Sequence, residues 1–153
     1  LCVPRLEERI ERDLFGNETA TRQWDALTER VAARRATGVF SDRRDVNGRV
    51  AFGPRYKRLT YKGVGVDLFS VLPPAQWGVI FTIRTGPADF SHRLVTSRLL
   101  GGWMPPGMKV EGGALWDRGA VVPTPEESGF FAALGLEYVE PEKRNATRTP
   151  VPA

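Results

Sequence analysis

Residues 64–72, Val-Gly-Val-Asp-Leu-Phe-Ser-Val-Leu, predict a β-strand that carries one carboxylate, Asp67. Residues 57–61 have a similar strand-favouring composition, so Lys62-Gly63 between them predicts a tight turn. An ionised carboxylate in apolar surroundings is costly unless a cation, a hydrogen-bond network or water faces it. Asp67 therefore either belongs to a functional site or points to solvent from the polar face of a half-exposed strand.

Basic residues precede this strand. Arg55, Lys57 and Arg58 lie near the start of the 57–61 strand, where Arg55 and Lys57 share one face and Arg58 takes the other. We expect these three to contact nucleic-acid phosphates, or else to form a solvated basic face. The chain has 22 Lys and Arg against 18 Asp and Glu, a net charge of +4, which permits nucleic-acid binding without requiring it.

Length and composition narrow the class of protein. A chain of 153 residues predicts one domain or two small lobes. Its single cysteine, Cys2, excludes an internal disulfide framework and favours a cytoplasmic location. Cys2 and the lone His92 are too few for a structural zinc site. No apolar run approaches the roughly 20 residues of a membrane span, so no membrane partner is expected.

Periodicity and turn signals predict an α+β fold of helices and short strands. The expected helices cover residues 5–14, 22–35 (capped by Thr21), 75–83, 88–100 and a segment that begins at Thr124-Pro125. Phe130, Phe131 and Leu134 would form the buried face of the last helix. The expected strands are 38–44, joined to 50–52 by an Asn47-Gly48 hairpin turn, then 57–61, 64–72, 108–110 and 114–116.

The order of these elements resembles the C-terminal palm and thumb of the family X DNA polymerases, the DNA polymerase beta-like nucleotidyltransferases. Four stretches carry the resemblance over about residues 50–145. They are Val-Gly-Val-Asp-Leu at 64–68, Pro-Pro-Ala-Gln-Trp-Gly at 73–78, Thr85-Gly86 followed by Phe90 and Arg93-Leu94, and Thr124 to Arg144 with its Phe-Ala-Ala-Leu-Gly-Leu and Tyr-Val-Glu-Pro-Glu-Lys-Arg runs.

The resemblance implies nucleotidyl transfer to a nucleic-acid 3′-hydroxyl by two-metal catalysis, with Mg²⁺ or Mn²⁺ as cofactor. Asp67 would be the catalytic carboxylate and a metal ligand. The residues that would meet the incoming nucleoside triphosphate are Thr85, Gly86, Phe90, Ser91 and Arg93. Packing in the core is the alternative role for Phe90, and a solvated surface is the alternative for Arg93. The partner would be a DNA primer and template, in repair or replication.

The sequence also departs from the family pattern. The family's acidic pair on a neighbouring strand has no counterpart before Pro4, so we expect an incomplete, inactive part of a larger enzyme. Many members carry arginine two residues before the aspartate, where this chain has Gly65. Ile83-Arg84 replaces an aromatic pair, and Ser91 replaces an asparagine that often reads the base edge. Family members bend the chain at the Thr-Gly turn, and a cis peptide is expected at Gly86-Pro87.

The organisation that the resemblance implies is a partial nucleotidyltransferase palm at 1–86, a mixed sheet with helices, then a small thumb-like lobe of short strands and helices at 87–145. A flexible tail is expected at 146–153. The alternative to a polymerase is a non-catalytic nucleic-acid-binding or assembly module on a degenerate nucleotidyltransferase scaffold.

Overall fold

The computed structural model describes residues 2–4 and 6–144, and the chain forms two compact units, Leu1–Ser70 and Val71–Ala153. Within the described residues, four α-helices and three small sheets give the expected α+β class. The strands of these sheets pair antiparallel, so the sheets are not the mixed sheet that was expected. The division falls before the predicted boundary at residue 86. The reason is α2 (Trp77–Thr85), which packs against α4 (Glu127–Ala133) and β7 (Ala114–Asp117) of the second unit. The palm assignment stays a prediction, and the predicted tail lies outside the described residues.

The first unit opens with a hairpin where a helix was predicted for residues 5–14. β1 (Leu6–Arg12) pairs antiparallel with β2 (Glu18–Asp25). The Asp13 carboxylate accepts hydrogen bonds from the backbone N–H groups of Phe15 (2.8 Å) and Asn17 (2.9 Å), which fixes the turn. The helix prediction is therefore wrong, because its i, i+4 spacing of apolar residues also places them on one face of a strand.

α1 (Ala26–Ala36) begins later than predicted because its start is set by Asp25, not Thr21. The Asp25 carboxylate accepts from the Leu27 N–H at 3.0 Å, whereas Thr21 lies in β2. The helix ends just before Gly38, as expected, where the backbone has φ +76°.

The second sheet of this unit has the order β3-β4-β5, formed by β3 (Phe40–Asp42), β4 (Tyr56–Tyr61) and β5 (Val64–Phe69). The predicted Lys62-Gly63 turn is confirmed, with both residues at positive φ. The predicted pairing of 38–44 with 50–52 is wrong, because β3 pairs with β4 instead. Residues 50–52 contribute a single bridge, Phe52 with Lys57.

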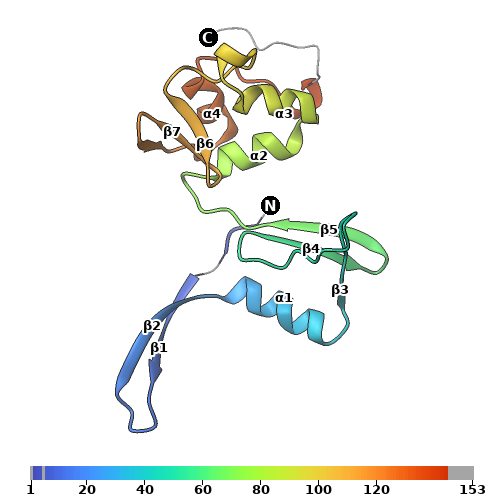
Figure 1. Cartoon of the computed structure of the whole chain (residues 1–153), viewed down its shortest axis with the longest axis vertical. Helices are drawn as coiled ribbons and strands as arrows, with labels where there is room; N and C mark the ends of the chain where they lie inside the picture. Colours follow the sequence, from blue (N-terminus) through green and yellow to red (C-terminus); the bar gives the residue numbers. More distant parts are fainter. Residues whose placement is uncertain (1, 5, 145–153) are drawn as a thin grey trace. The chain divides into compact units, whose positions relative to one another are not determined.

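α1 covers one face of this sheet (Figure 1). Arg35 of α1 binds Asp42 through two hydrogen bonds of 2.7 and 2.6 Å. Asp42 lies opposite the fully buried Leu59 of β4, so Leu59 belongs to the covered face. Because strand side chains alternate, Tyr56 and Arg58 lie on the other side of the sheet, which we term the distal face.

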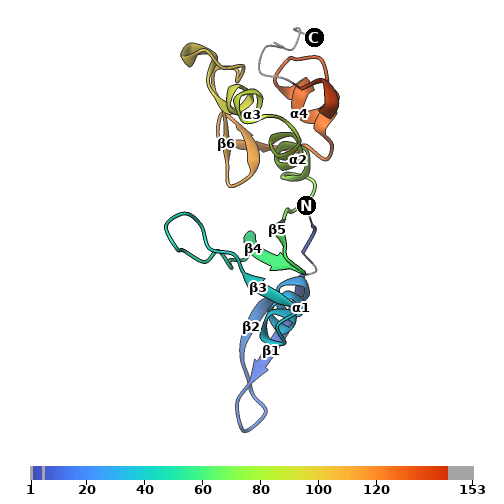
Figure 2. The same ribbon diagram turned by 90° about the vertical axis from the view of Figure 1, so that its right-hand side faces the viewer.

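The second unit surrounds an aromatic core. Besides α2, β7 and α4 it contains α3 (Ala88–Val95), β6 (Met108–Glu111), β8 (Ala120–Val122) and the 3₁₀ turns η1 (Arg98–Leu100) and η2 (Pro141–Lys143) (Figures 1 and 2). The predicted burial of Phe130, Phe131 and Leu134 is confirmed. β8 was not predicted. The predicted 88–100 helix breaks after Val95, so its last residues form η1.

Thr124 does not cap α4, which begins at Glu127 with Glu126 as its N-cap. The buried Thr124 hydroxyl instead donates to the Ala75 carbonyl at 3.0 Å, and its own carbonyl accepts from the Gly78 N–H at 2.8 Å. These bonds fasten the start of α2 to the segment before α4.

At Gly78 the start of α2 approaches the backbone before α4 most closely, so even a small side chain at this position should have a large effect. A Cβ at Gly78 would lie 2.2 Å from the backbone oxygen of Glu126, so backbone would have to move. We expect Gly78→Ala to destabilise the second unit by about 1–3 kcal/mol, as overpacking does. Urea unfolding followed by tryptophan fluorescence measures this change.

Gly129 of α4 supplies the matched control, because a Cβ there meets nothing within 4 Å. Gly129→Ala should stabilise the same unit by about 0.5–1 kcal/mol, since alanine favours helix more than glycine. Equal responses of the two variants would contradict the tight junction at Gly78.

Candidate functional site

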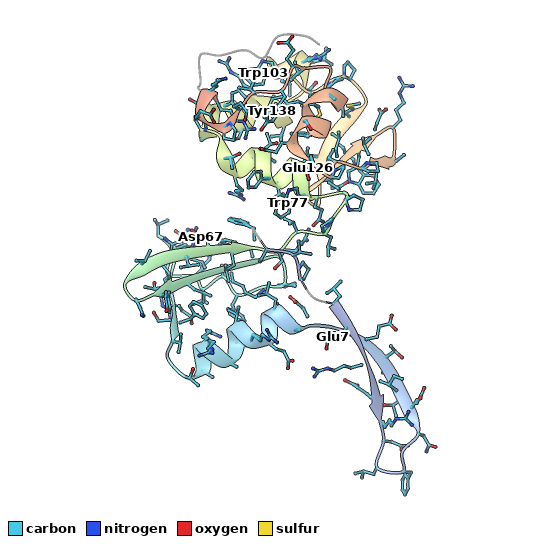
Figure 3. The ribbon with its side chains drawn as sticks, turned by 180° about the vertical axis from the view of Figure 1, so that it is seen from behind. Glu7, Asp67, Trp77, Trp103, Glu126 and Tyr138 are labelled. Carbon is cyan, nitrogen blue, oxygen red and sulfur yellow. The ribbon has the colours of Figure 1, made fainter. Side chains whose placement is uncertain are left out.

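Asp67 lies on the distal face of the first unit's sheet, on the edge strand β5 (Figure 3). Tyr56 donates its hydroxyl to Asp67 Oδ1 at 2.5 Å, and Arg58 Nε lies 3.4 Å from the same oxygen. Arg43 Nη2 donates to the other oxygen, Oδ2. Arg58 Nε also donates to the Tyr56 hydroxyl at 2.8 Å. The carboxylate is thus surrounded by two guanidinium groups and a phenol.

These neighbours determine the charge of Asp67. Partial burial raises the pKa of its carboxyl group, but the hydrogen bonds from Tyr56 and Arg43 outweigh this effect and hold the pKa below its usual value. The side chain remains 37 % exposed. Because the folded-state pKa is depressed, any stability gained from this pairing is present near neutral pH and is lost as the pH falls through the lowered value. Asp67 therefore lies on a half-exposed face of its strand, which is one of the two settings expected from the sequence.

Arg43 and Tyr56 were not predicted as site residues. Arg43 follows β3 and lies 24 residues before Asp67 in the sequence, so no short motif joins them. The excess of arginine between residues 29 and 62 was the available signal, and it does not single out one residue. Tyr56 lies between Arg55 and Lys57 in the sequence, and nothing in that run distinguished it as a partner of Asp67.

The predicted metal site does not fit the described residues. A hard divalent ion requires several oxygen ligands, usually carboxylates. The described residues contain no group of three His, Cys, Asp or Glu side chains that could hold an ion. Both oxygens of Asp67 already accept hydrogen bonds from cationic or phenolic donors. The role of Asp67 as a metal ligand therefore stays a prediction that these residues alone do not support.

The three predicted DNA-contacting cations have different surroundings. Lys57 is only 1 % exposed, and its Nζ donates to the Gly53 carbonyl at 3.0 Å, so its predicted phosphate contact is wrong. Lys57 lies on the face of the sheet that α1 covers, whereas Arg55 precedes β4 and is exposed. Arg58 is held by Tyr56 and Asp67. Arg55 is exposed, and its side chain has no partner among the described residues.

Two predicted nucleotide contacts are corrected in the second unit. Phe90 is fully buried, with its ring edge-on to Trp103 at a centroid distance of 5.2 Å. It therefore packs in the core and cannot stack on a nucleotide. Ser91 is 6 % exposed and donates its hydroxyl to the Ile83 carbonyl at 3.0 Å, so it is not available to read a base.

The half-buried Thr85 belongs to a polar network around the buried Glu127 and Arg144 side chains. Its hydroxyl donates to the Phe81 carbonyl at 2.8 Å and accepts from Arg144 Nη1. The same guanidinium binds Glu127 Oε1 at 2.7 Å, and the Tyr138 hydroxyl donates to Oε2 at 3.3 Å. Burial raises the pKa of Tyr138, and the Glu127 carboxylate raises it further. The sequence did not predict this network, since its charged members looked like ordinary surface residues.

Gly86 and Arg93 stay predicted nucleotide contacts. Gly86 is half-buried, and a Cβ there would lie 3.2 Å from the Phe90 ring. Arg93 is exposed, with its guanidinium carbon 5.9 Å from the centre of the Trp103 ring. The predicted cis peptide at Gly86-Pro87 is wrong, because the cis bond of the described residues is Pro73-Pro74.

The site residues are divided between the two units. Asp67, Arg55 and Arg58 lie in the first unit, together with Arg43 and Tyr56. The predicted nucleotide contacts lie in the second. Within the first unit, Asp67 lies beside Arg43, Tyr56 and Arg58.

Residues 84–145 match the family model of the DNA polymerase beta thumb. The matched segment begins at the end of α2 and includes α3, the β6-β7-β8 sheet, α4 and η2. It supports a thumb of the kind found in family X polymerases, and with it a DNA-binding, polymerase-like role. No curated protein matches the chain significantly. The described helices are all too short or too polar to cross a membrane.

Proposed function

We propose that this chain takes part in nucleotidyl transfer to a DNA 3′-hydroxyl, in the manner of polymerase beta-like enzymes. The observation that carries the proposal is the thumb match over residues 84–145. It is joined in sequence to a sheet whose distal face presents an ionised carboxylate, Asp67, among arginines. A nucleoside triphosphate and a primer–template DNA are the proposed substrates.

Asp67 is the proposed catalytic residue. Phosphoryl-transfer enzymes work mainly by positioning and by electrostatic stabilisation. With its lowered pKa, Asp67 is ionised at neutral pH and can accept a hydrogen bond from a primer hydroxyl. Mg²⁺ or Mn²⁺ remains the proposed cofactor and would neutralise charge on the transferred phosphate. Its binding requires carboxylates in addition to the one that the described residues place there.

The charge distribution indicates where DNA phosphates are attracted. Residues 1–70 contain fourteen Lys and Arg against ten Asp and Glu, whereas residues 71–144 contain seven against eight. The first unit therefore supplies most of the positive charge, and the exposed Arg55 is its candidate phosphate contact. Arg34 of α1 is also exposed and has no side-chain partner among the described residues, which makes it a control of equal charge.

Fluorescence anisotropy with a labelled primer–template, repeated over a salt series, tests DNA binding. We expect Arg55→Ala to reduce the slope of log affinity against log salt by about 0.9 on duplex, the loss of one phosphate contact. Arg34→Ala should reduce it less. The absence of salt-dependent DNA binding by the unsubstituted chain would refute the proposed DNA partner.

Primer extension by the whole natural protein with Mg²⁺ or Mn²⁺ tests catalysis. We expect extension that Asp67→Asn abolishes while DNA affinity is retained. The 153 residues alone should bind DNA without extending the primer, because Asp67 lacks companion carboxylates in the described residues. DNA binding by the whole protein without any extension would favour the non-catalytic binding module instead.

A further inference from the structure

Arg43 reaches Asp67 from the opposite edge of the sheet. It directly follows β3, and its backbone N–H donates to the Arg58 carbonyl of β4 at 3.4 Å. Because the strand order is β3-β4-β5, its side chain must extend past β4 to contact Asp67 on β5. The guanidinium therefore lies over the distal face.

Gly65 provides the space for this guanidinium. A Cβ at Gly65 would lie 2.6 Å from Arg43 Nη1 and 3.1 Å from Cζ, so the guanidinium would have to move to accommodate it. Gly65 does not have a positive φ, so its backbone conformation is open to any residue. The glycine therefore leaves room for the guanidinium in the place that it takes, and a Cβ there would displace the end of the flexible Arg43 side chain without moving backbone.

Arg43 also controls the orientation of the carboxylate. Tyr56 and Arg58 both donate hydrogen bonds to Oδ1 of Asp67, whereas Oδ2 accepts a hydrogen bond from Arg43. The Nε of Arg43 is buried and has no hydrogen-bond partner among the described residues. Leaving this donor unpaired costs free energy, and Arg43 nevertheless keeps its contact with Asp67. Hydrogen bonds to both oxygens oppose rotation of the carboxylate.

We propose that Arg43 is a positioning residue for Asp67, and that Gly65 is small so that Arg43 can take this place. Side chains at positions 65 and 67 share a face of the strand, so an arginine at 65 could reach Asp67 directly. The catalytic role of this positioning rests on the proposed function, but the contact between Arg43 and Asp67 can be tested without measuring a reaction.

NMR of the full 153-residue chain at neutral pH tests the pairing. A guanidinium held by a carboxylate rotates slowly about its Nε–Cζ bond, whereas a solvated one rotates fast. We expect slow rotation for Arg43 and fast rotation for Arg49, whose side chain has no partner among the described residues. Gly65→Ala should abolish the slow Arg43 signal although both charges remain.

Gly53→Ala is the matched control, since a Cβ there meets only the Tyr56 carbonyl oxygen at an ordinary 3.8 Å. It should leave the Arg43 signal unchanged. In the double variant Arg43→Met/Gly65→Arg, the slow signal should reappear at position 65. Slow rotation of Arg43 that survives Gly65→Ala in a folded protein would overturn the role of the glycine.

Primer extension by the whole natural protein separates the two proposals. Arg43→Met should lower kcat without weakening DNA binding, and the double variant with Gly65→Arg should restore kcat. Extension at an undiminished rate by Arg43→Met would overturn the positioning role and leave the proposed function standing. If NMR shows that Arg43 is held by Asp67 but neither the unsubstituted protein nor any variant extends a primer, the proposed function fails and the pairing remains.

Discussion

Glu127→Gln should lower the free energy of unfolding of the second unit by about 3–5 kcal/mol, the loss that follows when one partner of a buried ion pair is removed. The Arg144 side chain is fully buried, the Glu127 side chain is 9 % exposed, and Nη1 lies 2.7 Å from Oε1. The substitution preserves shape and removes the charge, so it leaves a guanidinium inside the protein without a counter-ion.

The pair joins three segments that are distant in sequence. Arg144 lies at the end of the described chain and donates through Nε to the Val139 carbonyl at 2.9 Å. Through Nη1 it reaches Thr85 at the end of α2 and Glu127 at the start of α4. Loss of the Glu127–Arg144 ion pair should therefore lower the stability of the whole second unit. A lower urea midpoint, monitored by tryptophan fluorescence, will show this change.

Two further variants identify the cause. The double variant Glu127→Leu/Arg144→Met removes both charges and should lose clearly less stability than Glu127→Gln. Glu111→Gln removes a carboxylate that is 64 % exposed and binds Lys109 at 2.7 Å on the surface, so it should leave the midpoint nearly unchanged. A Glu127→Gln protein as stable as Glu111→Gln would show that the buried pair contributes little.

The sequence predicted the elements best where local signals agreed with one another. Lys62-Gly63 between two strand-favouring segments specified the β4-β5 hairpin, and α2, β6 and β7 were predicted within a few residues of their bounds. The hairpin β1-β2 was missed because charged residues with apolar positions four apart suit either a helix or a strand. The turn that decides between them depends on hydrogen bonds of Asp13 to the backbone, which composition does not reveal.

The site was predictable only in part, for a related reason. A carboxylate in an apolar strand is conspicuous, so Asp67 was singled out from the sequence, and its catalytic role stays a prediction. Arg43 contacts it through tertiary structure, and the one trace in the sequence is the missing side chain at Gly65. Lys57 was misassigned because a strand has two faces, and the sequence did not show which one α1 covers.

Phe90→Ala should destabilise the second unit by about 3–5 kcal/mol, the usual range for removing a buried phenylalanine ring. Phe90 is fully buried, edge-on to Trp103 and 6.4 Å from the Phe131 ring centre. The substitution leaves a cavity where three aromatic rings meet, and neighbours in a packed core close such a cavity only partly. Three of the four tryptophans lie in this unit, so their fluorescence reports its unfolding.

Phe15→Ala is the control, because Phe15 is 89 % exposed in the hairpin turn of the first unit. It removes the same ring and should leave the tryptophan-monitored midpoint unchanged. The comparison also decides what Phe90 does in a thumb-like domain. A stacking platform for a nucleotide would lose affinity on truncation and keep the fold, whereas a core residue loses the fold first. Near-native stability of Phe90→Ala, together with weakened nucleotide binding, would show that Phe90 meets the nucleotide despite its burial in the core.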